Sequence, residues 1–411
     1  MSICWSKVDT YIGNYSSPEL TRYRPCPICG SIKSKVVLEL NDFQFFTDSY
    51  ENSKRVNIRE CMCLNCFAIY LNPGHSNYGI EVLYPQASQS YGSSEGRADE
   101  EVAWLMDKGL LKPGQKVLDI GCYDGSFLAR MPEDVEKVGI DMDAQAINRG
   151  RQRFKNQGIE FLIEDFENVN IKNAPNLITM FHVLKHLSRP TAVMRKLRTI
   201  SDSDTCLVVE VPILENGCTD DINGFFSVLH MTHFSRGSLK NCLSRSGWNI
   251  IEWHEQTDYN GCMILAKPSD ETAEHSENFQ DIILLNKYLS GWHDSLCKAN
   301  FKIIQIQQED NMYFVIWGAG LHTEFLYHTT IFFHANRNCL YIIVDSDEMK
   351  QGKTWRSISI YAPSVLTKID WSHALLLLSS YQNQEIMANT AHCAGVPYKK
   401  IIRLYDEIHV H

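Results

Sequence analysis

Two pairs of cysteines near the start of the chain have the spacing of a metal site. Cys26 and Cys29 form one CxxC pair, and Cys63 and Cys66 form a second. A two-residue gap lets both thiolates turn toward one ion, and two such pairs supply the four ligands of a closed zinc site. A set of buried free cysteines is the alternative, and Cys61 is a competing ligand. Four thiolates leave no open coordination position, so we expect a structural zinc.

A second group of residues could hold an adenosine cofactor. In the stretch VLDIGCYDGSFL, an apolar run ends in Asp119 and is followed by Gly121, Cys122 and Gly125 before a helix is expected. The later segment GIDMD places Asp141 twenty residues after Gly121. That is the position at which an acid receives the ribose hydroxyls of such a cofactor. We therefore predict that these residues contact it.

A third acid supports the same prediction. The segment IEDF ends in Asp165 and Phe166, where a side chain can meet the adenine amino group, and Met142 follows the second acid directly. The loop has Tyr123 where a central glycine is usual, and it lacks the GxGxxG dinucleotide fingerprint. Any turn from strand to helix favours glycine, which would account for Gly121 alone. It does not account for acids at three successive strand ends.

Histidines follow two later apolar segments. MFHVLKHLSRP contains His182 and His186, and FFSVLHMTHFSRGSL contains His230 and His233. A histidine is the natural base for a weakly acidic proton near neutral pH, and we assign that role to His230. The alternatives are structural: His182 lines the cofactor pocket, His186 caps a helix, and His230 stabilises its loop.

The elements that position these residues are strands alternating with helices, which is typical of a doubly wound α/β fold. After a cysteine-rich, irregular segment, the first set of predicted strands is Lys116–Ile120, Lys137–Asp141, Glu160–Ile163, Asn176–Phe181 and Cys206–Val211. A long helix is expected within 270–310. The alternation then restarts with Tyr313–Trp317, Leu340–Val344, Ala374–Ser379 and Ile401–Leu404. We predict two Rossmann-like units behind a zinc module, with boundaries at 1–80, 81–270 and 271–411.

The second unit has its own candidate binding residues. FVIWGAGLHTEFL gives a strand, a turn with Gly318 and Gly320, and a helix that begins near His322. IIVDSD places Asp345 at the next strand end, and LLLSSYQNQEI adds Ser380 and Tyr381 at a later one. A helix N-terminus at such a turn can receive phosphate, so we predict a mononucleotide site. A scaffold that only covers the mouth of the first site is the alternative.

Composition limits the function classes. The chain has 411 residues, a net charge of −10 and no block of like charges, which argues against nucleic-acid binding by broad phosphate neutralisation. Neither a signal segment nor an apolar run of membrane-spanning length is present in the sequence. Fourteen cysteines without an export signal suggest free thiols and metal ligands. We therefore expect a cytoplasmic monomer without a membrane span.

Three segments resemble motifs of one enzyme class. DIGCYDGSF resembles the first motif of class I S-adenosyl-L-methionine (SAM) methyltransferases, usually DxGxGxG, in which the carboxylate and glycine backbone receive the methionine part of the cofactor. HVLKHLSRP resembles the HVLEHL–P stretch after their fourth strand, with Lys185 where glutamate is common. The segment around His230 resembles the H–x–x–Y/H–F–S segment that crosses the mouth of their pocket.

The order of zinc module, SAM domain and second Rossmann-like domain resembles the sugar C-methyltransferases that build branched deoxysugars. In that family the substrate is a nucleotide-linked 4-keto-6-deoxysugar. A base removes the proton at C3, and the enolate attacks the methyl group of SAM. The resemblance covers nearly the whole chain and implies a substrate bound between the two Rossmann-like units, with His233 near it.

The departures from that family concern the partners of the base. Its Y–H–E–H segment ends at the histidine that matches His230, but Ser227, Val228 and Leu229 stand at the other three positions. His186 is therefore a second candidate base. The family's Y–x–S–S loop corresponds to SYGSSEG, so Tyr91 is a candidate for steering substrate or enolate.

Two alternatives remain open. One is an O-methyltransferase that acts on a sugar or a lipid-linked glycan, which the altered SVLH segment favours. The other is a zinc-dependent scaffold without catalysis, for which Tyr123 and Lys185 would argue. The intact Asp119, Asp141 and His230 favour an enzyme.

Overall fold

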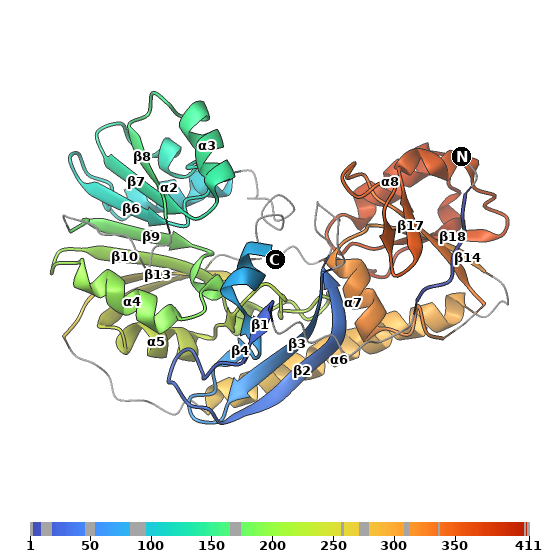
Figure 1. The fold of residues 1–411 in the computed structure, drawn as a ribbon, viewed down its shortest axis with the longest axis horizontal. Helices are drawn as coiled ribbons and strands as arrows, with labels where there is room; N and C mark the ends of the chain where they lie inside the picture. Colours follow the sequence, from blue (N-terminus) through green and yellow to red (C-terminus); the bar gives the residue numbers. More distant parts are fainter. Residues whose placement is uncertain are drawn as a thin grey trace.

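The computed structural model describes residues 3–9, 19–45, 54–82, 96–164, 174–255, 259–270, 279–307, 312–335, 338–406 and 408. Two α/β units lie at opposite ends of the molecule, and a long hairpin and helix α6 (Gln280–Ile306) run between them (Figure 1). Within the described ranges, no helix is long and apolar enough to cross a membrane.

The first unit is a seven-stranded sheet in the order β12-β13-β10-β9-β6-β7-β8, in which β13 runs antiparallel to its two neighbours and the other strand pairs are parallel. Its central strands are almost wholly apolar and buried because both faces of the sheet are covered. The strands are β6 (Lys116–Ile120), β7 (Glu136–Asp141), β8 (Ile159–Ile163), β9 (Leu177–Phe181), β10 (Cys206–Pro212), β12 (Trp248–Glu255) and β13 (Gly261–Pro268). The helices are α2 (Arg97–Asp107), α3 (Ala144–Arg153), α4 (Pro190–Thr199) and α5 (Arg236–Ser244).

The helix expected directly after the Gly121–Gly125 loop is only a 3-10 turn, η1 (Leu128–Arg130). Pro132 explains the difference, because the residue before a proline avoids the helical region. Met131 is accordingly extended, with ψ 156°.

The cysteine-rich segment is more regular than predicted. It forms the long antiparallel hairpin β2 (Ser34–Phe45) and β3 (Lys54–Cys63), which continues into β4 (Ile69–Leu71). A strand from the first α/β unit, β11 (Thr232–His233), completes this sheet by pairing with β4. A second, two-stranded sheet joins β1 (Thr21–Arg22) to β5 (Gly74–His75).

The second α/β unit is a six-stranded sheet in the order β16-β17-β15-β14-β18-β19, parallel except for β16. Its elements are β14 (Tyr313–Trp317), α7 (Leu321–Thr329), β15 (Leu340–Val344), β16 (Thr354–Trp355), β17 (Ile358–Tyr361), β18 (Ala374–Leu378), α8 (Gln384–Cys393) and β19 (Ile401–Ile402). Residues 3–9 lie against this unit: Ser6 pairs with Tyr341, and Trp5 packs on Tyr313 with ring centroids 4.9 Å apart. The start of the chain therefore contacts the last unit as well as the cysteine segment.

A buried ionic network attaches the second unit to the β2–β3 hairpin. Arg356 Nη2 donates to Glu324 Oε1 at 2.6 Å and to the backbone oxygen of Asp42 at 2.7 Å. Glu324 also accepts from Trp355 Nε1 at 2.7 Å and from the backbone N–H of Gln44 at 2.8 Å. The side chains of Arg356, Glu324 and Asp42 are all 0–1% exposed. Each buried charge therefore depends on the others for compensation.

We expect Arg356→Met to lower the free energy of unfolding by about 3–5 kcal/mol, because it removes the buried cation that Glu324 and Asp42 share and leaves only His328 beside Glu324 and Arg55 beside Asp42. Urea denaturation measures this change. Lys302→Met is the control: Lys302 Nζ pairs with the exposed Asp406 at 2.7 Å. Removing such a surface pair changes stability by roughly 1 kcal/mol or less. Equal stability of the two variants would contradict the assigned role of the network.

Candidate active site

The loop after β6 has the backbone conformation of a ligand-binding turn. Gly121 and Gly125 have φ of 75° and 76°, and Tyr123 adopts φ 51°, a left-handed conformation that is unusual for a tyrosine. Tyr123 is held there by its neighbours. Its N–H donates to Asp141 Oδ2 at 2.8 Å, and its hydroxyl accepts from Arg149 Nη2 at 3.1 Å. The tyrosine therefore occupies the backbone position for which glycine is usual.

Both glycines are also required by close packing. A Cβ on Gly121 would lie 2.2 Å from the Val183 side chain, and one on Gly125 would lie 2.5 Å from the Phe161 ring. The absence of a Cβ at these two positions therefore lets the loop pack against Val183 and Phe161.

Two acids face this loop from neighbouring strand ends. Asp119, at the end of β6, accepts from Thr179 Oγ1 at 2.7 Å and is 4% exposed. Burial raises the pKa of Asp119 to about 7, and the charge of Asp141 adds to this shift. A cationic ligand group beside Asp119 would stabilise its ionised form. Asp141 accepts from the N–H groups of Tyr123 and Asp143, both at 2.8 Å.

A buried carboxylate, Glu210, lies on β10, which β9 separates from β6 in the sheet. Its Oε1 accepts from the Tyr259 hydroxyl at 2.7 Å and lies 2.9 Å from His182 Nε2, and its side chain also pairs with Arg97. The Arg97 guanidinium stacks 3.7 Å above the Tyr259 ring centroid. Burial by itself raises the pKa of Glu210. The hydrogen bonds and charges of His182, Arg97 and Tyr259 outweigh burial and hold that pKa at about 2.

A lysine continues this cluster on the loop after β9. Lys185 Nζ lies 3.2 Å from His182 Nδ1, and Lys185 is 9% exposed. Burial, together with the charge of Arg97 and despite that of Glu210, lowers the pKa of Lys185 to about 7. His182 has φ 58°, a strained backbone conformation of the kind found at functional sites.

Three of the predicted histidines gather next to Lys185. The ring centroids of His186 and His230 are 5.1 Å apart, and those of His230 and His233 are 5.7 Å apart. Burial and the Lys185 charge lower the pKa of His230 well below its ordinary value, and the pKa of His186 to about 3. Both imidazoles are therefore neutral at pH 7. His230 in its neutral form can accept a proton.

A carboxylate from the hairpin reaches the same group. Glu60 Oε1, on β3, lies 3.0 Å from His233 Nε2, and both side chains are fully buried. His186 Nδ1 lies 3.1 Å from the Leu229 backbone oxygen, which fixes the ring that faces His230.

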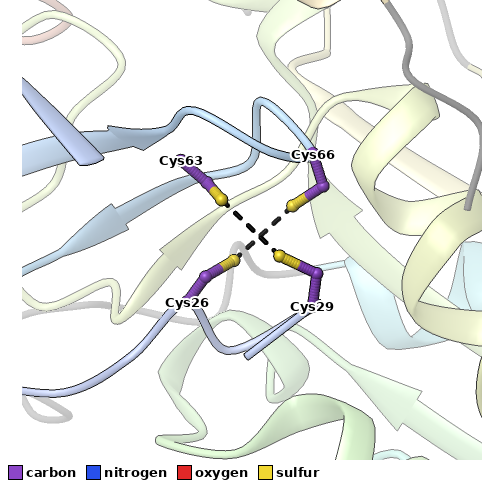
Figure 2. A group of neighbouring side chains, drawn as sticks. All are labelled: Cys26, Cys29, Cys63 and Cys66. Atoms are coloured by element: carbon purple, nitrogen blue, oxygen red, sulfur yellow. Dashed lines mark hydrogen bonds between the residues drawn. The ribbon is translucent and has the colours of Figure 1, made fainter. Parts of the chain in front are cut away.

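The four predicted metal-ligating cysteines come together. The sulfur atoms of Cys26, Cys29, Cys63 and Cys66 all lie within 4.8 Å of one another and point toward a common centre (Figure 2). Cys26 Sγ is 3.5 Å from Cys66 Sγ, and Cys29 Sγ is 3.6 Å from Cys63 Sγ. Cys61 is outside this group, with its sulfur 3.7 Å from the backbone oxygen of Asn72.

The second unit repeats the acid arrangement of the first. Asp345, at the end of β15, accepts from the Ala319 N–H at 2.6 Å and from the Asp347 N–H at 2.9 Å, as Asp141 does in the first unit. Gly318 has φ 124°, and a Cβ there would lie 2.8 Å from the Ser379 backbone oxygen. Gly320 is the N-cap of α7.

Two of the predicted substrate residues of this unit are internal. The ring nitrogens of His322 lie 2.9 Å from Ser379 Oγ and 2.7 Å from the Tyr405 hydroxyl. Tyr381 is buried against Tyr405, with ring centroids 4.7 Å apart. Ser380, which caps the turn before α8 by accepting from the Asn383 N–H, is half-buried. The strand-end position of these residues agrees with the prediction, but His322 and Tyr381 are engaged within the fold.

Most predicted cofactor residues share one sheet edge: Asp119, Gly121, Cys122, Gly125, Asp141, Met142 and His182. Met142 is exposed, whereas Cys122 is buried. Tyr91, Asp165 and Phe166 lie outside the described residues. The sequence interpretation missed Arg97, Glu210 and Tyr259. A single glutamate within the apolar strand CLVVEVP was the available signal for Glu210.

Comparison with known proteins identifies the first unit. Residues 94–252 match the sequence model of a family described as methyltransferase domain. The matched residues include the loop after β6, the strand ends with Asp119 and Asp141, and the four histidines. This part of the chain is therefore similar in sequence to methyltransferase domains.

Individual relatives are distant and match in part. The cyclopropane-fatty-acyl-phospholipid synthase of Escherichia coli is 23% identical over 232 residues, 52% of this chain and 56% of that protein. An uncharacterized methyltransferase of Mycobacterium tuberculosis is 32% identical over 108 residues, 25% of this chain and 55% of that protein. The chain thus spans about half the length of these relatives. A solved SAM-dependent methyltransferase from Clostridium acetobutylicum covers 47% of this chain and 98% of its own, with 11% identity and a TM-score of 0.36.

The Glu210 cluster predicts a pH-dependent contribution to stability. Glu210→Gln removes the buried carboxylate that pairs with the half-buried Arg97 and with His182, so we expect the free energy of unfolding to fall by on the order of 3 kcal/mol at pH 7. The pKa of a glutamate in the unfolded chain is about 4.5, and hydrogen bonds and charges lower the pKa of Glu210 in the folded protein to about 2. The contribution is therefore present above pH 4.5 and is lost as pH falls toward 2.

Urea denaturation at pH 7, 4 and 3 tests this expectation. The gap in stability between wild type and Glu210→Gln should narrow as pH falls. Glu252→Gln is the control, because it removes a partly exposed partner of Lys108. Its free energy of unfolding should differ from that of wild type by about 1 kcal/mol or less at pH 7. A gap for Glu210→Gln that stays constant from pH 7 to 3 would show that its carboxylate is not the stabilising group.

Proposed function

We propose that this chain transfers a methyl group from SAM to C3 of a nucleotide-linked 4-keto-6-deoxysugar. The observation that carries the proposal is the neutral, buried His230 between His186 and His233, at the edge of the methyltransferase sheet. A carbon acceptor needs a base and an adjacent carbonyl group, whereas the sulfonium of SAM supplies a strong methyl donor when bound. His230 would supply this base, at the edge of the sheet that carries the predicted cofactor residues.

The residues at the cofactor edge fit SAM. The buried carboxylate of Asp119 suits a cationic ligand group, and the nearby Gly121 is partly exposed. Asp141 keeps lone pairs free for ribose hydroxyls, since each of its oxygens accepts a single backbone N–H. The role of these residues in the reaction is to align the acceptor with the methyl group and to exclude water.

The second α/β unit would hold the nucleotide. Its strand-end acid, Asp345, repeats the arrangement of Asp141, and the Gly318 turn leads into the N-terminus of α7. Such a turn suits phosphate, and the acid suits ribose hydroxyls. Lys350, whose Nζ is 3.7 Å from Asp345, adds positive charge at this edge.

Methyl transfer to a hydroxyl group is the second candidate. A neutral histidine can also activate a hydroxyl, which needs no adjacent carbonyl group. The apolar burial of Val228 and Leu229, where the similar C-methyltransferases carry histidine and glutamate, favours this candidate.

To test the proposal, purified protein is incubated with SAM and dTDP- or GDP-4-keto-6-deoxyhexoses in deuterated water, and products are read by mass spectrometry and NMR. We expect one added methyl group on C3. His230→Ala should lose both methylation and C3 deuterium exchange while it still binds S-adenosylhomocysteine, whereas Asp119→Ala and Asp141→Ala should bind S-adenosylhomocysteine weakly. Methylation of an oxygen would instead establish the second candidate.

Absence of any transfer by a protein that binds S-adenosylhomocysteine would contradict the proposed acceptor class. Absence of binding in wild type would favour a scaffold without catalysis. Retained turnover in His230→Ala would move the base to His186 or Tyr91.

We also propose that the cysteine cluster holds a structural zinc ion. A tetrahedral ion with Zn–S bonds of about 2.3 Å separates its sulfur ligands by roughly 3.8 Å. The two measured sulfur pairs, at 3.5 and 3.6 Å, lie close to that spacing. Four thiolates would leave no position for substrate, so the ion would act on folding.

Cys63→Ser should reduce bound zinc from one ion per chain to a small fraction of that, measured by elemental analysis, because one of four thiolate ligands is lost. Cys61→Ser is the matched control, since Cys61 is buried nearby but bonds to Asn72. It should keep its zinc. Equal zinc content in the two variants would contradict the assigned ligand set.

A further inference from the structure

An amine, an imidazole and a carboxylate form a continuous chain at the acceptor side of the methyltransferase sheet. Lys185 Nζ lies 3.2 Å from His182 Nδ1, and His182 Nε2 lies 2.9 Å from Glu210 Oε1. The Tyr259 hydroxyl lies 2.5 Å from His182 Nε2 and donates to the same Glu210 oxygen at 2.7 Å. With Glu210 ionised, Nε2–H faces these two oxygens, which leaves Nδ1 free to accept from Lys185. Glu210 thus fixes the tautomer of His182, and His182 orients the amine.

Lys185 is placed between this chain and the candidate base. Its backbone oxygen accepts from the Met231 N–H at 2.8 Å, which joins the lysine loop to the segment that carries His230. The charge of Lys185 lowers the pKa of His186 and of His230. The titratable and charged groups around the amine are His182, Glu210 on β10, Arg97 on α2, and the two histidines His186 and His230.

A second buried lysine shows what a purely structural role looks like. Lys137, on β7, is 2% exposed, and its Nζ donates to the backbone oxygens of Met131 and Gln157, both at 3.4 Å. Lys185, by contrast, has a single hydrogen-bond acceptor, His182 Nδ1, among the residues that the structure describes. An ammonium has three N–H donors, so two of those of Lys185 have no recorded acceptor in that part of the chain.

We propose that Lys185 is a catalytic residue that donates to the carbonyl oxygen of the acceptor as negative charge develops there. The proposal rests on the proposed function, since it requires a ketone beside the methylated carbon. A preorganised donor in a dry site stabilises a developing oxyanion far more than water does.

The proposed step moves one proton and two electron pairs before the methyl transfer. His230 takes the proton from C3, and the C–H electron pair forms the C3–C4 double bond while the carbonyl pair moves to oxygen. Lys185 gives a hydrogen bond or its proton to that oxygen. As the methyl group passes from sulfur to C3, the carbonyl would re-form, any proton on its oxygen would return to Lys185, and the sulfonium would become a neutral thioether. His230 would then release the C3 proton to solvent.

An amine whose pKa lies near neutrality suits this exchange. Burial and Arg97 lower the pKa of Lys185 to about 7, so giving up its proton to an enolate oxygen costs little free energy. An unperturbed lysine, with a pKa near 10.4, would hold its proton more tightly.

The experiment isolates enolisation from methyl transfer. Full-length protein is saturated with S-adenosylhomocysteine, and C3 deuterium exchange of a 4-keto-6-deoxysugar nucleotide that wild type accepts is followed by NMR. We expect Lys185→Met to slow exchange by at least about 100-fold, the effect of losing one oxyanion donor. Its affinity for S-adenosylhomocysteine should stay within about twofold of wild type, which also shows that the variant is folded. Lys137→Met should exchange at the wild-type rate.

The pH profile separates donation from packing. Wild-type exchange should fall as pH rises above about 7, because the ammonium loses its proton. Lys185→Arg keeps a charged donor at all these pH values and should not show that fall. Exchange by Lys185→Met within about threefold of wild type, or an unchanged fall in Lys185→Arg, would overturn the role of Lys185 alone. A wild type that neither exchanges nor methylates any ketone would overturn the proposed acceptor, and this role with it.

Discussion

The pairing of β11 with β4 is the constraint on which the arrangement of the clustered histidines His186, His230 and His233 depends. β4 begins three residues after Cys66, and its Ile69 and Tyr70 pair with His233 and Thr232. Because β4 also pairs with β3, which ends at Cys63 of the cysteine cluster, the hairpin and the histidine segment belong to one sheet. The position of His233 is therefore set from outside the methyltransferase sheet. A change in the cysteine cluster would be transmitted to the site through backbone hydrogen bonds.

Buried carboxylates join the parts of the molecule in the same way. Glu60 of the hairpin faces His233, and Glu324 of the second α/β unit binds Arg356, which also binds Asp42 of the hairpin. A buried charge without its partner is costly, so each contact is stable only in one relative position of the two parts. The hairpin is consequently the common reference for both α/β units. Figure 1 shows it running between them.

The sequence was most informative where both sides of a strand are buried. β6, β14 and β15 have the predicted bounds because their apolar runs end sharply, at Gly121, Gly318 and Asp345. The edge strand β12 was missed because only part of it is buried, and its polar residues hide the pattern. The cluster around Glu210 was missed for a different reason. Arg97 and Tyr259 are more than 100 and nearly 50 residues away along the chain, and local spacing does not show such contacts.

The substitution of the residues before His230 has a structural explanation. Val228 and Leu229 are packed in the apolar core that the hairpin shares with the second unit, where an ionised glutamate would be buried without a partner. A carboxylate nevertheless reaches the histidines, because Glu60 extends to His233 from β3. Similarly, Lys185 stands where a glutamate is common, and Glu210 supplies the negative charge from the adjacent strand. The charges of the site are thus contributed by different strands from those that the motifs alone would indicate, and they meet at the same edge of the sheet.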